Sequence, residues 1–255
     1  MQIKYMDWRS DQEVEEERLA LTYHHNSNLY PQFDVLTRSR MKMLKRLFSQ
    51  MNQTVTPAKR YYASPRYSMK KLDRKEHPFI ANLANRLDEL QENVKPYKDF
   101  ESLRELGAAH SLDSPDIYLL SKNRISQELE LFYCSPAEGY IEFVKGPIDP
   151  NWHEAAFDPG MGVQEGDGAV FITANLHRSM KLFGERGYRL SLLEGGRLTE
   201  RLLQCTKESG SKVSPLMTFY DKAVHELLGI DGYYEVVLSV LTFREEELIC
   251  TNINL

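Results

Sequence analysis

The sequence is poor in cysteine and contains no long apolar run. Its three cysteines, Cys134, Cys205 and Cys250, are far apart and form no CxxC pair. This spacing excludes a disulfide framework and a zinc knuckle and indicates a reducing compartment. Nowhere do about 18 apolar residues follow one another, and the N-terminus lacks the charged and then apolar pattern of a signal peptide. We therefore expect a cytoplasmic protein that does not enter the membrane.

The sequence also lacks a metal-binding pattern. His24 and His25 are adjacent, but neighbouring side chains point in different directions on any regular element, and no third ligand lies nearby. We expect no metal site.

Acidic residues are missing from one long segment. Residues 35–72 hold ten basic side chains and no acidic one, whereas the whole chain has a net charge of −5. The segment is compatible with a solvated basic face, a ligand that carries phosphate, or an acidic protein or peptide partner. Nucleic acid is the least supported partner, because no nucleic-acid-binding motif accompanies the charges and the remaining chain is acidic.

The spacing of apolar residues predicts an α+β fold. We expect helices at 10–22, 37–51, 78–90, 186–208 and 223–229, and strands at 116–121, 128–134, 139–144, 169–174 and 233–243. The stretch 52–64 reads as an extended connection beside Pro57 and Pro65. It predicts a boundary between an N-terminal helical extension, residues 1–60, and a domain that comprises residues 61–255.

The aromatic and cationic segment 178–189, with the helix after it, is where the sequence indicates a site in addition to a core. An apolar stripe along this helix is predicted from residues that recur every three or four positions: Tyr188, Leu192, Gly196, Thr199 and Leu203. Gly195 and Gly196 lie in mid-helix, where each costs about 1 kcal/mol relative to alanine. The pair therefore indicates either a plain helix junction or the close approach of another backbone or a flat ligand.

Two motifs carry a resemblance to a known family. Residues 182–189 read Leu-Phe-Gly-Glu-Arg-Gly-Tyr-Arg and precede Leu-Leu-Glu-Gly-Gly at 192–196, while Leu-Leu-Gly-Ile-Asp-Gly-Tyr-Tyr-Glu occupies 227–235. In this order they resemble the nitroreductase-like flavoproteins, and specifically the SagB-type dehydrogenases that oxidise azolines to azoles in modified peptides. The resemblance spans roughly residues 23–243. It implies a nitroreductase-like fold with a mainly antiparallel sheet, flanking long helices and a homodimer with two flavins at its interface.

The resemblance also implies a cofactor site. It assigns the phosphate of FMN to three residues, Arg66, Ser68 and Lys70. Such cations suit phosphate, since arginine bonds two oxygens at once and lysine supplies a point charge. The family's segment around the flavin ring corresponds to residues 107–118, where Asp116 and Tyr118 keep an acid and a tyrosine. His110 stands in that segment where the flat ring needs room.

The family's proton-transferring Lys-Tyr pair is replaced here by Leu182 and Phe183. Neither side chain can act as an acid or a base. Lys181 is one position away, and that displacement turns its side chain in a different direction on a regular element. The remaining candidates for catalysis are Lys181, Tyr188 and His110, and an enzyme of new chemistry would use His110, Glu194 or Tyr188.

Two functions of different classes follow from these observations. The first is an FMN-dependent oxidoreductase of the SagB type, acting on an azoline-modified peptide or a related heterocycle in natural-product biosynthesis. The second is a flavin-free relative that keeps the fold and serves as a binding or scaffold subunit of a peptide-modifying complex. Its basis is the loss of the Lys-Tyr pair and of the ring-binding serine and glycine. The implied partners are a second copy of the chain and a precursor peptide or a cyclodehydratase-type protein.

Overall fold

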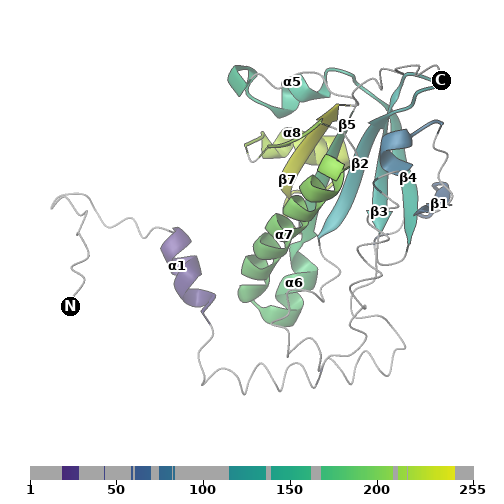
Figure 1. Cartoon of the computed structure of the whole chain (residues 1–255). Helices are drawn as coiled ribbons and strands as arrows, with labels where there is room; N and C mark the ends of the chain where they lie inside the picture. Colours follow the sequence, from purple (N-terminus) through teal and green to yellow (C-terminus); the bar gives the residue numbers. More distant parts are fainter. Residues whose placement is uncertain are drawn as a thin grey trace.

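The computed structural model describes most of the C-terminal half of the chain and parts of the N-terminal half (Figure 1). The described residues are 19–28, 43, 59, 61–69, 75–81, 83, 115–135, 139–161, 168–208, 212–216 and 218–244. The predicted helix at 37–51 lies almost wholly outside them. The same holds for His110 and Lys70.

The described strands form one seven-stranded sheet in the order β1-β4-β3-β2-β5-β7-β6. They are β1 (Arg66–Ser68), β2 (Asp116–Lys122), β3 (Leu129–Ser135), β4 (Tyr140–Ile148), β5 (Gly168–Asn175), β6 (Lys212–Leu216) and β7 (Glu235–Arg244). Every neighbouring pair is antiparallel. The α+β class and the antiparallel sheet are therefore confirmed.

Helices pack on both sides of this sheet (Figure 1). The described helices are α1 (Leu19–Asn26), α5 (Trp152–Ala156), α6 (Leu176–Phe183), α7 (Arg186–Glu208), α8 (Asp221–Leu228) and the 3-10 turn η3 (Pro159–Met161). Residues 78–81 are helical as well, which confirms the predicted start at Pro78. The 23-residue α7 has the predicted bounds.

The alternation of side chains along each strand gives the sheet two separate cores. Ile117 and Ile172 point into one core, where they pack with Leu202 of α7. Tyr118 and Phe171 point into the other, which is covered by buried side chains of α5 and α8: Ala156, Val224 and Leu228. The molecule is thus a sheet between two helical layers. The second layer also borders the polar cluster described below.

The central strands confirm the predicted segments. Strand β5 is buried along nearly its whole length, as its continuous run of apolar residues requires. Its first residue, Gly168, has to be a glycine, because a Cβ there would lie 2.0 Å from the carbonyl oxygen of Leu120. The close spacing of β2 and β5 thus depends on a missing side chain.

The apolar stripe predicted on α7 is wrong in part. Leu192 is 44% exposed and Gly196 is exposed, whereas Leu190, Ser191 and Leu202 are buried. Helix α7 therefore turns a different side toward the sheet and α6 than the apolar stripe predicts. Close contacts at two glycines explain this difference. A Cβ on Gly187 would lie 2.4 Å from the backbone of Ser179 in α6, and a Cβ on Gly195 would lie 2.5 Å from Leu238 Cδ1 in β7.

The two mid-helix glycines therefore differ in their roles. Gly195 permits a close approach, but its neighbour is the side chain of Leu238 and neither a backbone nor a flat ligand. A Cβ on Gly196 would meet no atom within 4 Å. The buried side of α7 is the side on which Gly187 and Gly195 let neighbouring elements approach closely. The hydropathy of the sequence alone does not show which side that is.

Four short elements were missed. Strands β1 and β6 and helices α5 and α6 were not predicted, and β6 contains Pro215, which argues locally against a strand. Pro215 is tolerated because β6 is the last strand in the sheet order and pairs with β7 on one side. Helix α6 begins where the Asn175 side chain accepts a hydrogen bond from Arg178 N at 3.0 Å.

Helix α1 contacts the turn between α6 and α7. The rings of Tyr23 and Tyr188 meet edge to face at 5.5 Å, and Arg186 Nη1 donates to the carbonyl of Ser27 at 3.2 Å. The helix continues to Asn26, so the predicted end of the first helix at residue 22 is wrong. The division at residue 60 stays a prediction. Among the described helices, none is long and apolar enough to cross a bilayer.

Candidate functional site

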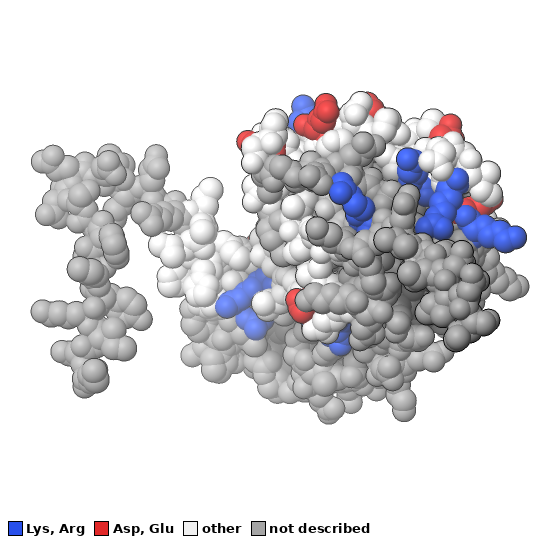
Figure 2. All heavy atoms as spheres, turned by 45° about the horizontal axis from the view of Figure 1, so that its top comes forward, with Lys and Arg blue, Asp and Glu red and all other residues white. Residues whose placement is uncertain are grey.

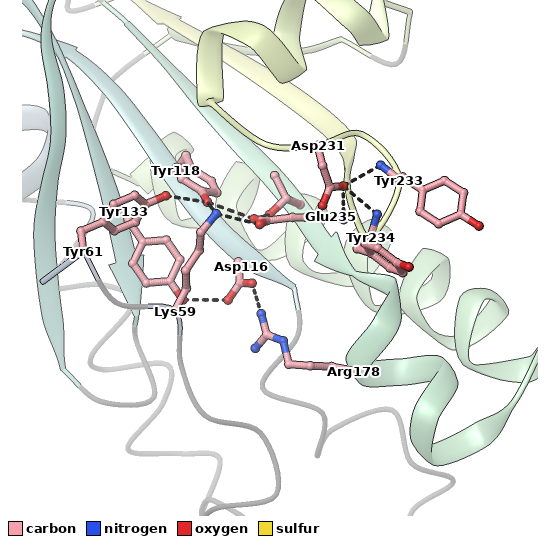
Figure 3. Close-up of polar contacts among 11 residues, drawn as sticks. Lys59, Tyr61, Asp116, Tyr118, Tyr133, Arg178, Asp231, Tyr233, Tyr234 and Glu235 are labelled. Atoms are coloured by element: carbon pink, nitrogen blue, oxygen red, sulfur yellow. Dashed lines mark hydrogen bonds and ion pairs between the residues drawn. The ribbon is translucent and has the colours of Figure 1, made fainter.

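A cluster of charged and phenolic side chains lies at one end of the sheet, on the side that α5 and α8 cover (Figure 3). We call it the polar cluster, and its members come from separate parts of the chain. They are Lys59, Tyr61, Asp116, Tyr118, Tyr133, Thr173, Arg178 and Glu235. It contains two cations and two carboxylates, so its formal charges balance.

Glu235 is the acceptor at the centre of the polar cluster. Its Oε1 accepts hydrogen bonds from Tyr118 OH at 3.0 Å and from Thr173 Oγ1 at 3.2 Å. Its Oε2 forms an ion pair with Lys59 Nζ at 2.8 Å. Glu235 is only 6% exposed. A buried carboxylate requires such partners, because an unpaired charge in this environment costs several kcal/mol.

The loop before β7 holds Glu235 in place. The Asp231 carboxylate accepts the backbone N–H groups of Tyr233, Tyr234 and Glu235 at 2.7, 2.6 and 3.0 Å (Figure 3). These bonds lower the pKa of Asp231, and the bond from the Glu235 amide has the largest effect. Gly232 follows with φ 68°, in the left-handed region that favours glycine. The Asp-Gly pair thereby orients the start of β7.

Asp116 is the second buried carboxylate. Tyr133 OH donates to its Oδ1 at 2.8 Å, and Arg178 forms an ion pair with its Oδ2. Burial raises the pKa of Asp116, and the positive charge of Arg178 opposes this effect without cancelling it. Arg178 reaches Asp116 because it lies in the first turn of α6, directly after β5.

Burial keeps the phenols of Tyr118 and Tyr133 protonated. It raises the pKa of Tyr118 and of Tyr133 far above the ordinary value of 10.0, and the nearby carboxylates raise them further. Lys59 behaves in the opposite way. Burial acts to lower its pKa, but the charge of Glu235 and the hydrogen bond to it outweigh burial, and the pKa is raised. The cluster therefore contains an ammonium at Lys59 and neutral phenols at Tyr118 and Tyr133.

Lys59 and Tyr61 contact the same side of the sheet. Tyr140 OH donates to the carbonyl of Lys59 at 3.1 Å, and the backbone N–H of Tyr61 donates to Glu142 Oε2 at 3.0 Å. Arg66 then pairs with the other oxygen of Glu142. We call Lys59 and residues 61–66 the strap. It connects the polar cluster to strand β1.

A separate open cavity of about 440 Å³ lies between α7, α8 and β7. Tyr188 and Leu192 line it from α7, Asp221 and His225 from α8, and Tyr233 from the loop before β7. His225 Nε2 accepts the backbone N–H of Val237 at 3.2 Å, so this histidine is part of the wall. The cavity holds one predicted catalytic candidate, Tyr188, and no member of the polar cluster.

No family model matches the chain, and no curated protein matches it by sequence. Solved structures match its fold. A candidate nitroreductase from Anabaena variabilis aligns with a TM-score of 0.58 at 16% identity, over 88% of this chain and 46% of that one. The chain has a nitroreductase-like fold.

Two further structures are less similar to this nitroreductase-like fold. A candidate nitroreductase from Ralstonia eutropha aligns with a TM-score of 0.47 at 14% identity, over 76% of this chain and 89% of that one. The E. coli microcin synthetase McbBCD complex with truncated pro-MccB17 bound gives a TM-score of 0.47 at 16% identity, over 55% and 54% of the two chains. Since this chain spans less than half of the Anabaena protein, that comparison concerns the fold alone.

Within the nitroreductase-like fold, two predicted phosphate ligands lie together. Arg66 and Ser68 are two positions apart on β1, so their side chains share one face, and both residues are exposed. Arg66 donates to Glu142 through Nε at 2.8 Å and also through Nη2, and its guanidinium lies 3.9 Å from the centre of the Tyr140 ring. A guanidinium and a hydroxyl on one exposed face fit a phosphate in chemical type.

The predicted catalytic candidates do not converge in the described part of the chain. Lys181 lies in α6, and Tyr188 faces the cavity and Tyr23. Glu194, also considered, pairs with Arg197 at 2.6 Å. The assignments of Lys181, Tyr188 and His110 to catalysis stay predictions.

Sequence reasoning missed most of the polar cluster. Asp116, Tyr118 and Glu235 stood out only as members of family motifs, with no role. Lys59 was one of ten cations in a basic segment, and nothing in its neighbourhood distinguished it. On the face that Figure 2 shows, the described Lys and Arg side chains form separate patches, some of them next to acidic groups. The density of basic residues along the sequence therefore did not distinguish Lys59 from the other lysines and arginines of this segment.

Proposed function

We propose that the protein is a flavin-dependent oxidoreductase. One observation carries the proposal: residues from three separate motif matches belong to one hydrogen-bonded network on one face of the sheet. Arg66 connects through Glu142 to the backbone of Tyr61, and the Tyr61 hydroxyl lies 3.0 Å from that of Tyr118. Tyr118 in turn donates to Glu235. Perturbed, buried titratable groups of this kind are concentrated at functional sites.

FMN would be held through its phosphate by Arg66, Ser68 and Lys70, and it would supply two-electron hydride chemistry. Glu142 fixes the plane of the Arg66 guanidinium, while 40% of the arginine side chain stays exposed. The same carboxylate neutralises the positive charge of Arg66. Lys70 would therefore contribute the net positive charge that a phosphate requires.

The finer assignment comes from the resemblance to SagB-type dehydrogenases. We propose that the substrate is a heterocycle-containing peptide, with an azoline or a related ring, and that the active form is a homodimer. The dimer proposal is supported by apolar side chains on the surface around α7 and the loop before β7. Leu192, Leu193 and Tyr233 are 44%, 62% and 73% exposed. A second copy would cover such a patch.

A flavin-free binding subunit is the second candidate. Two observations favour it: Leu182 and Phe183 stand where the resemblance places a Lys-Tyr pair, and Glu142 already engages Arg66. Under this proposal the cluster and the strap serve only to stabilise the fold. The protein would then assist a peptide-modifying partner without transferring electrons.

The flavin content of the purified full-length protein separates the two candidates. We expect a yellow protein that releases equimolar FMN when it is denatured. Arg66→Met should weaken FMN binding, measured by flavin fluorescence. Lys222→Met is the matched control, because the Lys222 side chain is 91% exposed and lies 3.9 Å from the carboxylate of Glu226. A colourless protein with no thermal shift on FMN addition would favour the binding subunit.

A further inference from the structure

The cavity between α7, α8 and β7 combines one charged group with an apolar wall. The wall is formed by Leu176, Leu192, Val236 and Leu238. Among the described residues that line the cavity, Asp221 alone carries a formal charge, and none is a lysine or an arginine. The volume of about 440 Å³ falls within the range of ligand pockets, about 300–1,000 Å³. A small molecule, or the end of a chain, with a positive group and an apolar body therefore fits in size and charge.

The Asp221 carboxylate is available to such a positive group. It is exposed in the first turn of α8, and within the described part of the chain no cation pairs with it. The adjacent Lys222 lies 3.9 Å from the carboxylate of Glu226. The positive end of the α8 dipole opposes a cation here, but it amounts to about half a charge, against the full charge of the carboxylate. The net field still favours an ammonium group.

His225 supplies a hydrogen-bond donor to the same cavity. Its Nε2 accepts the backbone N–H of Val237 at 3.2 Å, so Nε2 is unprotonated and the proton of the neutral ring is on Nδ1. Nδ1 has no acceptor among the described residues and is not buried. Gly232 leaves room beside it, because a Cβ there would lie 2.3 Å from Nδ1. His225 thus presents an N–H group to a carbonyl oxygen in the cavity.

The backbone of β7 does not offer an edge for strand addition beside the cavity. Of the described strands, β6 pairs only with the second half of β7, so the first half has no strand on that side. Its polar groups are nevertheless occupied. Asp231 accepts the N–H of Glu235, whose carbonyl accepts the N–H of Gly232 at 3.1 Å. His225 accepts the N–H of Val237. A ligand is therefore recognised by the side chains of the cavity.

The spacing of Asp221 and His225 selects the chemistry of the ligand. They are four positions apart on α8, so their side chains share one helix face with Cβ atoms about 5–6 Å apart. The amino end of a peptide carries an ammonium and a carbonyl oxygen joined through one Cα, and it can meet both side chains at once. Its first side chain then lies against the apolar wall. A lysine side chain would supply an ammonium without the adjacent carbonyl.

We propose that this cavity binds an ammonium group next to a carbonyl and an apolar side chain, as at the amino end of a peptide with an apolar first residue. Asp221 pairs with the ammonium, and His225 Nδ1 donates to the first carbonyl. The site uses no flavin and no member of the polar cluster, so it goes beyond the proposed function and is compatible with both candidates. Leu192 and Tyr233 also belong to the patch proposed for a second copy, so the site requires that a dimer leave the cavity open.

Titration calorimetry of the full-length protein with short peptides tests this site. We expect Leu-Gly-Gly amide to bind, and its N-acetylated form to bind at least about 10-fold more weakly, because acetylation removes the charge. Gly-Gly-Gly amide should bind about 5- to 10-fold more weakly, as partial burial of a leucine side chain predicts. Leucinamide separates the two sources of this chemistry. Weaker binding of leucinamide than of the tripeptide identifies a peptide, and equal binding identifies a free amino acid derivative.

Two pairs of variants assign the contacts. Asp221→Asn should weaken Leu-Gly-Gly amide about 3- to 10-fold, as loss of an exposed ion pair does. Glu226→Gln is the matched control, because Glu226 is on the same helix, 70% exposed and outside the lining. Leu192→Ser should reduce the preference for a leading leucine over glycine. Its control is Leu193→Ser, at a neighbouring position that is 62% exposed and also outside the lining.

The pH dependence of binding gives a test without any substitution. The amino group of a peptide has a pKa of about 8. Binding of Leu-Gly-Gly amide should therefore weaken between about pH 7 and pH 9, as the ligand loses its proton. The acetylated peptide has no such group and should show no comparable change. Binding of the free peptide that stays constant over this range would contradict the pairing with Asp221.

The outcomes separate this site from the proposed function. No binding of Leu-Gly-Gly amide to the wild type, whether or not a second copy closes the cavity, would overturn the site. Equal binding of the free and acetylated peptides, or equal binding by Asp221→Asn and Glu226→Gln, would overturn it as well. A colourless protein that binds the peptide would support the site and contradict the flavin-dependent function. A yellow protein that does not bind it would do the reverse.

Discussion

Arg66 and Glu142 lie opposite each other on β1 and β4, and the guanidinium donates through two nitrogens to one carboxylate oxygen. The other oxygen of Glu142 accepts the backbone N–H of Tyr61. One buried carboxylate, 2% exposed, therefore holds both the edge strand and the strap. Lys59, at the other end of the strap, is held separately by Tyr140, Tyr118 and Glu235.

Glu142→Ala should destabilise the protein by about 1–3 kcal/mol, since it leaves the Tyr61 amide without its acceptor and Arg66 without its ion pair. Glu142→Gln should cost less, because its amide oxygen still accepts one hydrogen bond. Urea unfolding followed by circular dichroism measures both. Equal stability of Glu142→Ala and wild type would contradict the role of this residue as the anchor of the strap.

Two glycines of α7 should respond in opposite ways to the same substitution. Gly187→Ala should cost about 1–3 kcal/mol, because its Cβ would collide with the Ser179 backbone, which cannot rotate away. Gly196→Ala should stabilise by about 0.5–1 kcal/mol, because no atom lies near its Cβ position and alanine favours the helix. Thermal unfolding of the two variants tests this. If both raise the melting temperature, α6 and α7 pack less tightly than these distances require.

Stability should fall as the solution becomes alkaline. Burial raises the pKa of the Cys134 thiol to about 12, and the pKa values of Tyr118 and Tyr133 are raised as well. Between their unfolded and folded pKa values these groups hold protons only in the folded state. Each group therefore lowers the free energy of unfolding by about 1.4 kcal/mol per pH unit, starting near its unfolded pKa of 9.0 or 10.0.

Urea unfolding at a series of pH values between neutral and alkaline measures this slope. Tyr133→Phe removes one of the three groups and should flatten the slope above the ordinary tyrosine pKa, while Tyr220→Phe, at an exposed position, should not. An unfolding free energy that is constant over this range would show that water reaches the phenols in the folded state.

The Asp231 carboxylate should prove important for the start of β7. Asp231→Ala removes the acceptor of three backbone N–H groups and should cost about 0.5–2 kcal/mol, comparable to the loss of a helix cap. Asp231→Asn keeps an oxygen in place and should cost less. Amide hydrogen exchange at Tyr233, Tyr234 and Glu235 gives a local measurement. Unchanged protection of these amides in Asp231→Ala would rule out the capping role.

Patterns that depend on neighbours in the sequence predicted most of the sheet. Alternation and β-branched or aromatic content placed β2, β3, β4, β5 and β7, and the bounds of α7 were predicted as well. The short strand β1 was missed, because its three exposed residues form a strand only through pairing with β4. Strand β6 was missed because Pro215 breaks the local pattern, and an edge position tolerates it.

The candidate site was predictable only in fragments. The motif matches singled out Arg66, Ser68 and the segments that contain Asp116 and Glu235. They did not indicate that Lys59 would meet Glu235, 176 positions later in the chain. The apolar stripe predicted on α7 also differs from the side that the structure buries. Tyr188 and Leu192 face a cavity, and the buried side includes Ser191.

The sequence by itself determined the elements whose signal repeats over a few residues: the alternating strands, the helix start at Pro78, the end of the helix expected at 223–229 and the extent of α7. Only the tertiary structure decided which carboxylates are buried and which cation neutralises each. Hydrophobic periodicity is a local property, because it follows from the geometry of one helix or one strand. Burial and charge pairing are set by segments that fold together from distant parts of the chain, so Lys59 gains its partners, and its raised pKa, only once the sheet has formed.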